Sequence, residues 1–169
     1  VGDVVSFNIM VNTGNQKVAA YGMEITYDST VLGNPNVAAG ADGFVSATNT
    51  TNPGKIVTSG FDASGKGPGT ELHLLTVTMD AIGAGTSAID ILVKQLVDEK
   101  TATIGTPNGI GGTITVIDGE TPTPTPVITA PPTDPPGVGD VSMSPSSISA
   151  EVGDVVSFNI MVNTGNQKV

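Results

Sequence analysis

Catalysis and metal binding need particular side chains, and this sequence holds few of them. His73 is the only histidine, and there is no cysteine, so the chain offers no thiolate metal site, cysteine nucleophile or disulfide bond. A serine nucleophile would need His73 next to an activated hydroxyl and an acid. His73 instead stands between Leu72 and Leu74 in an expected strand. A structural histidine is the preferred interpretation, and we expect no enzyme.

The acidic residues could serve two other chemistries. A glycosidase uses two facing carboxyl groups, but Asp98 and Glu99 are neighbours, and neighbouring strand residues point to opposite faces. Residues 62–65 (Asp-Ala-Ser-Gly) resemble the start of a calcium loop, yet the later oxygen ligands and the terminal glutamate of an EF-hand are missing. We therefore expect a solvated acidic edge and no cofactor, and leave calcium at an acidic loop open.

An internal repeat is the clearest feature of the chain. Residues 1–18 and 152–169 are both VGDVVSFNIMVNTGNQKV, an identity at all 18 positions. Identity at a fixed spacing is typical of tandem arrays. We interpret the chain as one period of 151 residues followed by the opening of the next.

Composition narrows the classes of partner. The chain carries 16 acidic residues against 6 Lys and Arg, a formal net charge of −10, which repels phosphate backbones and anionic lipids. We expect no nucleic-acid partner. No apolar run approaches the ~20 residues of a membrane span, so we also expect no membrane insertion in this segment.

Apolar and polar residues alternate along most of residues 1–118, which indicates strands with one buried face. The predicted inward residues are Val5, Phe7, Ile9, Val11, Tyr21, Met23, Ile25, Tyr27, Leu75, Val77, Met79, Ile89, Ile91, Val93, Ile114 and Val116. We expect shorter strands at 43–47 and 55–59, with turns at 12–15, 33–36, 52–54, 64–69 and 106–109. This pattern predicts an all-β, antiparallel two-sheet sandwich with jelly-roll topology.

Residues 119–139 break the alternation with seven prolines and are predicted to form a semi-rigid polyproline linker. Its Thr-Pro repeats make Thr121, Thr123 and Thr125 candidate O-glycosylation sites, and Asn49 opens a candidate N-glycosylation sequon. Residues 140–169 are expected to be the first strands of the next repeat. The domain at 1–118 would then lack its first strand in this window. That strand would come from the preceding copy, from this chain folding back, or from a neighbouring chain.

Several segments occur in an order that resembles a known family. They are VGDVVSFNI at 1–9, YDSTVL at 27–32, GTEL at 69–72, GTSAI at 85–89 and GTITV at 112–116. Together they resemble the cohesin domain, the jelly-roll module of cellulosome scaffolds and of many archaeal and bacterial surface proteins. The resemblance implies a non-catalytic domain that binds dockerin modules through one sheet face. Ala20 and Gly22 stand where binding cohesins tend to carry polar side chains.

Two functions follow, both at the cell surface or outside the cell. The preferred one is structural: the repeats form the shaft of a surface filament, stalk or sheath by assembly with neighbouring copies. Strand exchange would supply the joint, and the candidate assembly strand carries Val152, Val156, Phe158, Ile160 and Val162. The alternative is a scaffoldin-type cohesin that binds dockerin-bearing proteins.

Overall fold

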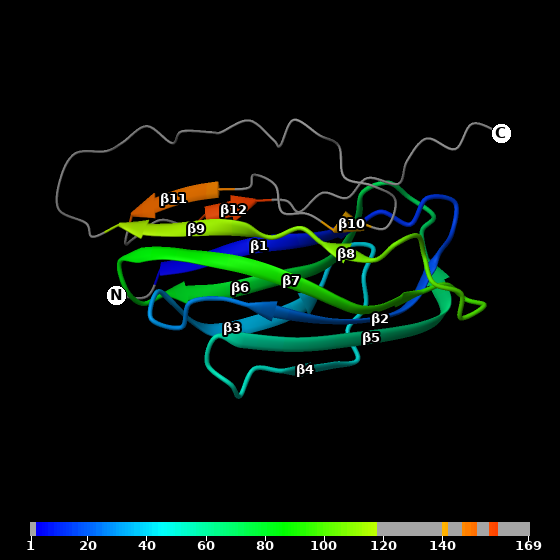
Figure 1. Cartoon of the computed structure of the whole chain (residues 1–169), viewed down its shortest axis with the longest axis horizontal. Coiled ribbons are helices and arrows are strands. Elements are labelled where there is room, and N and C mark those ends of the chain that lie inside the picture. Colours follow the sequence, from blue (N-terminus) through cyan, green and yellow to red (C-terminus); the bar gives the residue numbers. More distant parts are fainter. Residues whose placement is uncertain (1–2, 118–139, 142–146, 152–155, 159–169) are drawn as a thin grey trace.

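The computed structural model describes residues 3–117, 140–141, 147–151 and 156–158 (Figure 1). Every regular element in these ranges is a strand, so none of them is a helix long and apolar enough to cross a membrane. The strands are β1 (Asp3–Val11), β2 (Val18–Thr26), β3 (Leu32–Ala39), β4 (Ala47–Asn49), β5 (Lys55–Lys66), β6 (Leu72–Ala81), β7 (Gly85–Val97), β8 (Asn108–Gly109), β9 (Gly112–Ile117), β10 (Asp140–Val141), β11 (Ser147–Glu151) and β12 (Val156–Phe158).

Two sheets form the layers of a sandwich, as predicted. One has the order β12-β1-β6-β3, and the other has the order β11-β9-β7-β2-β5-β4. All neighbours from β1 to β7 and β9 pair antiparallel. The strands β10, β11 and β12 are added in parallel to β8, β9 and β1. The fold is therefore an all-β, antiparallel two-sheet sandwich with a parallel closing strand.

The core confirms the alternation in the sequence. Fifteen of the sixteen residues predicted to face inward are buried, and Val93 is half-buried against them. Tyr21 is 2% exposed, and its hydroxyl donates to the carbonyl of Phe44 at 2.6 Å. The Phe44 ring lies 5.5 Å from the Tyr21 ring, centroid to centroid. Aliphatic side chains and these few rings thus fill the space between the sheets without a tryptophan.

Four local predictions were wrong, and one of them is the turn expected at 106–109, where Asn108 and Gly109 form β8. Residues 33–36 were expected to be a turn, but they belong to β3, an edge strand that pairs only with β6. Pro35 is tolerated there because an edge strand has one side without ladder bonds, and Asn34 adopts φ 45° where the register shifts. The strand expected at 43–47 begins only at Ala47, and β5 extends through Lys66 into the predicted turn at 64–69.

The strands near the C-terminus bear on the predicted strand exchange. β11 lies along β9, so in this chain residues 147–151 fill the place beside β9. Of the candidate assembly strand, Val156 and Phe158 belong to β12 beside β1. Val152, Ile160 and Val162 lie outside the described residues, as do Thr121, Thr123 and Thr125.

Candidate protein-interaction face

The outward side of strands β4, β5, β2 and β7, called here the outer face, carries several exposed apolar side chains. Of the five exposed large hydrophobic side chains among the described residues, three lie on it: Val57 is 41% exposed, Phe61 67% and Leu92 52%. Single exposed apolar residues are ordinary, but a group on one sheet face is typical of an interaction surface. The remaining two, Val4 and Ile82, belong to or follow strands of the other sheet.

The register arranges the outer face in rows. One row runs from Asn49 through Val57 and Glu24 to Leu92, because each is the paired neighbour of the next. A parallel row places Ala20 beside Phe61. Paired residues of adjacent strands lie on the same side of a sheet, so Val57 and Leu92 flank the Glu24 carboxylate, and Phe61 lies beside Ala20.

Small residues in the middle of the outer face make a shallow depression between the larger side chains. Gly22 pairs with Ser59 on one side and with Gln95 on the other. A Cβ added at Gly22 would meet nothing nearer than the Gln95 Cβ at 4.0 Å. The positions that the resemblance singled out, Ala20 and Gly22, therefore lie between the exposed apolar side chains, where they form a shallow floor.

Glu24 is the charged centre of this face. Its carboxylate contacts the Lys55 ammonium at 2.9 Å and the Lys94 ammonium at 3.6 Å. The hydrogen bond from Lys55 lowers the pKa of Glu24, and the charges of Lys55 and Lys94 lower it further. The carboxylate thus stays ionised and partnered at neutral pH. Lys94 is thus an exposed partner of Glu24.

The other sequence candidates have structural partners. The His73 Nδ1 accepts from the Ala41 backbone N–H at 3.3 Å, and Nε2 lies 2.9 Å from the Thr76 hydroxyl. A nitrogen that accepts a hydrogen bond carries no proton, so Nε2 is the donor to Thr76, whose hydroxyl donates in turn to Asn8. This direction is opposite to the one that would activate a hydroxyl nucleophile, and His73 ties residues 40–42 to β6.

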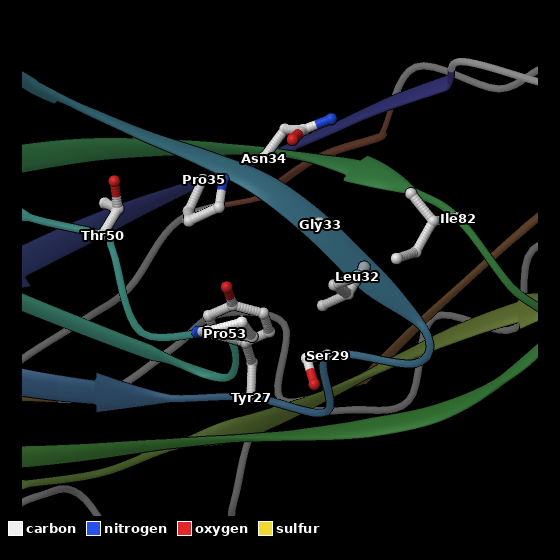
Figure 2. A pocket seen from close by; sticks show the side chains of 9 residues that line it. All are labelled: Tyr27, Ser29, Leu32, Gly33, Asn34, Pro35, Thr50, Pro53 and Ile82. Atoms are coloured by element: carbon white, nitrogen blue, oxygen red, sulfur yellow. The ribbon is translucent and has the colours of Figure 1, made fainter.

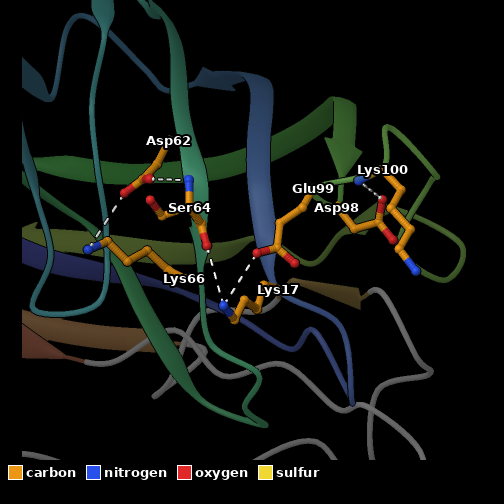
Figure 3. Close-up of polar contacts among 7 residues, drawn as sticks. All are labelled: Lys17, Asp62, Ser64, Lys66, Asp98, Glu99 and Lys100. Carbon is orange, nitrogen blue, oxygen red and sulfur yellow. Dashed lines mark hydrogen bonds and ion pairs between the residues drawn. The ribbon is translucent and has the colours of Figure 1, made fainter.

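The acidic residues are likewise engaged (Figure 3). Asp98 closes its own loop, because Oδ1 accepts from the N–H groups of Lys100 and Ala102 at 2.9 and 2.8 Å. The bond from Ala102 lowers the pKa of Asp98 most, with a further contribution from Gln16. Glu99 pairs instead with the Lys17 ammonium at 3.3 Å. The two carboxylates therefore have separate structural partners, in agreement with a solvated edge.

Two lysines contact residues 62–65, the segment that resembles the start of a calcium loop. Asp62 Oδ1 accepts from the Ser64 N–H at 2.8 Å, and Oδ2 lies 3.6 Å from the Lys66 ammonium. The Ser64 carbonyl accepts from Lys17 at 3.4 Å. No group of three or more His, Cys, Asp or Glu is placed to hold a metal ion among the residues that the structure describes.

A pocket of about 500 Å³ lies where β2 leads into β3 (Figure 2). Polar and apolar groups share its lining about equally, and none of the lining residues is charged: Tyr27, Ser29, Leu32, Gly33, Asn34, Pro35, Thr50, Pro53 and Ile82. The lining residues include hydroxyl groups but no carboxylate, histidine or lysine that could activate them. The outer face remains the stronger candidate site.

Comparison with solved structures identifies the fold. A chain of the crystallised complex of CaDoc0917 with CaCohA2, a protein from Clostridium acetobutylicum, is 23% identical, with a TM-score of 0.57 over 69% of this chain and 91% of that chain. A non-cellulosomal cohesin from the archaeon Archaeoglobus fulgidus is 16% identical, with a TM-score of 0.58 over 69% and 82%. The chain has a cohesin-like fold.

A third structure agrees with this assignment. The cohesin-like chain is 15% identical to a chain of a type I cohesin–dockerin complex from Clostridium thermocellum, with a TM-score of 0.52 over 67% of this chain and 99% of that chain. At these identities the likeness concerns the fold alone. No family model matches the cohesin-like chain, and no curated protein matches it.

Proposed function

We propose that this cohesin-like domain is a non-catalytic protein-interaction module that binds a dockerin-type partner through the outer face. The observation that carries the proposal is the group formed by Val57, Phe61 and Leu92, exposed around a low floor on a regular sheet. Two of the structural neighbours are cohesins in complexes with dockerins, which supports this class of partner.

The chemistry of the outer face describes the partner surface. Apolar side chains are needed opposite Val57, Phe61 and Leu92, because burying them supplies most of the free energy of association. The ion pairs of Glu24 with Lys55 and Lys94 lie between these residues. A partner that covers them must leave the pairs intact, since breaking a buried charge pair is costly.

The comparisons favour this module over the filament shaft that the sequence alone made the preferred function. The structural neighbours are cohesins, two of them in complexes with dockerins. The acidic charge of −10 keeps such a module soluble among its copies. We place the module outside the cell or on its surface, in keeping with the repeat and the Pro-Thr linker.

Binding of purified dockerins tests the proposal. The probes are CaDoc0917 and the dockerin of the Clostridium thermocellum complex, titrated calorimetrically against the 169-residue chain. We expect Phe61→Ala and Leu92→Ala to weaken binding by about 2 kcal/mol each, the cost typical of a central interface residue, which is about thirtyfold in Kd. The control is Val4→Ala, since Val4 is 40% exposed on the other sheet.

Two results would contradict this assignment. If Val4→Ala weakened binding as much as Phe61→Ala, the docking surface would lie elsewhere. If no dockerin bound the unmodified chain, a dockerin-type partner would be excluded, and the structural role of the repeat would become the better explanation.

A further inference from the structure

Strand β9 has two neighbours of different origin. On one side it pairs antiparallel with β7. On the other side it pairs in parallel with β11, from Ser147 opposite Thr113 to Glu151 opposite Ile117. Without β11 this side of β9, called here the β9 edge, would expose a row of unpaired N–H and carbonyl groups. Such an edge is a template for another strand.

The chain before β11 follows the same course. Asp140 and Val141 pair in parallel with Asn108 and Gly109 of β8, so 140–141 and 147–151 lie in order along β8 and β9. Recognition of this kind uses main-chain hydrogen bonds, as in the addition of an extended peptide to a sheet. The β9 edge therefore accepts an extended segment in a defined direction and register.

When each period is counted from residue 140, where the first strands of the next repeat are expected to begin, the segment that fills the β9 edge belongs to the following period. Residues 147–151 stand directly ahead of residues 152–169, which repeat residues 1–18. The same segment would stand ahead of Val1 wherever another period precedes it. Each β9 edge in an array thus has two candidate strands, one ahead of its own β1 and one from the following period, and the structure contains the second.

The pairing of β12 with β1 could not persist in an array of complete periods. β12 pairs in register with β1, so that Val5 lies opposite Val156. In a parallel pair, opposite residues direct their main-chain N–H and C=O groups the same way across the sheet. The side of β12 that faces β1 is therefore the same side that β1 itself uses to pair with β6. A complete following period would need those groups for its own copy of β6. The pairing of β11 with β9 has no such conflict, and it can join consecutive periods.

We propose that the β9 edge is a strand-acceptor site whose ligand is residues 147–151 of the following period, so that consecutive periods share one sheet. This site is separate from the outer face, and it does not depend on dockerin binding. Its ligand is a copy of the same repeat.

Disulfide trapping tests the register, because the chain has no cysteine of its own. Ser149 is the paired neighbour of Thr115, and adjacent strands lie about 4.8 Å apart, within the range that a disulfide spans. We expect Thr115→Cys with Ser149→Cys to oxidise almost completely. Thr115→Cys with Ser147→Cys is the matched control, since an offset of two residues places the two Cα atoms about 8 Å apart. Equal yields from the two variants would overturn the register.

Competition between the two candidate strands tests the donor. The 169-residue chain is extended by a copy of residues 140–151 ahead of Val1, so that both strands are present. Cysteine at Thr115 is combined with cysteine either at Ser149 or at the copied Ser149. We expect the following segment to give the larger disulfide yield. A larger yield from the copied segment would show that each domain closes with its own strand, and the proposal would fall whether or not the chain binds a dockerin.

Discussion

The hydroxyl of Tyr21 is buried between the sheets with one carbonyl as its acceptor. Burial raises the pKa of Tyr21 to about 12, although a hydrogen bond with Thr58 opposes the rise. The folded state therefore holds this proton more tightly than the unfolded state. The resulting contribution to the free energy of unfolding is complete below pH ~10 and is lost as the pH rises towards ~12.

Tyr21→Phe should separate this effect from ordinary packing. At neutral pH the variant should lose about 1 kcal/mol with the hydrogen bond. Between pH ~10 and ~12 the wild type should lose up to roughly 3 kcal/mol that the variant does not lose. Urea unfolding at a series of pH values measures both curves. Parallel curves over that range would show that Tyr21 does not titrate in this way.

Asp98 gives the corresponding effect in acid. Its carboxylate accepts two backbone N–H groups of the 98–102 loop, and the pKa of Asp98 is lowered by them. The stabilisation is present above the ordinary pKa of an aspartate and is lost as the pH falls through the lowered one. We expect Asp98→Ala to lower the urea midpoint of unfolding at pH 7. In strong acid the midpoints of the variant and the wild type should be equal.

Glu99→Ala is the matched control for Asp98→Ala. Glu99 is the next residue, and its pair with Lys17 is exposed on both sides, so its loss should hardly change the midpoint. If the two variants had the same effect at pH 7, the loop bonds of Asp98 would contribute no more than a surface charge pair.

At the level of the strands, glycine serves two purposes in the same sheet. Gly60 of β5 faces the core, where an added Cβ would lie 2.4 Å from Tyr21 Cε1 and 2.7 Å from the Phe44 carbonyl oxygen. Gly22 of β2 faces outward, with open space above it. Only the first position requires the absence of a side chain.

Alanine at these two positions should therefore have opposite consequences. We expect Gly60→Ala to destabilise the fold by about 1–3 kcal/mol through overpacking. Gly22→Ala should leave stability unchanged or raise it slightly, because it restricts the unfolded chain. Thermal unfolding of both variants decides the matter, and a stable Gly60→Ala variant would mean that the Tyr21 and Phe44 rings can move apart.

The sequence predicted these strands where alternation was regular and failed where an edge strand broke it. Core strands must bury one face, so their period is visible in residues such as Phe7 and Ile89. β3 lies at an edge and tolerates Pro35, which reads as a turn. The resemblance pointed to Ala20 and Gly22 on the outer face, but the exposed apolar side chains around them were missed, although Leu92 alternates with the inward Ile91 and Val93. The available signal for an exposed apolar face was Leu92, an apolar residue between the outward Asp90 and Lys94. Phe61 was missed because it lies beyond the strand predicted at 55–59.

At the level of the whole molecule, the closing strand should contribute to stability. A chain ending at residue 118 lacks β11 and its five paired residues. At ~0.2–1 kcal/mol per cross-strand pair, the loss should be on the order of 1–5 kcal/mol, and the exposed β9 edge should promote self-association. Denaturant unfolding and light scattering of this chain measure the two effects.

A chain ending at residue 151 is the control for this truncation. It retains β10 and β11 but removes β12, so it should match the 169-residue chain in stability. If removing residues 152–169 cost as much as removing everything after residue 118, the contact between β12 and β1 would be the important one.

The inward placement of Tyr21 and Tyr27 has an optical consequence. These are the only tyrosines, and the chain has no tryptophan. Its tyrosine fluorescence therefore reports the packing between the sheets and carries no signal from the outer face. If a binding partner contains a tryptophan, that tryptophan can be excited selectively because this chain has none. The tryptophan emission will then report whether that side chain enters an apolar contact.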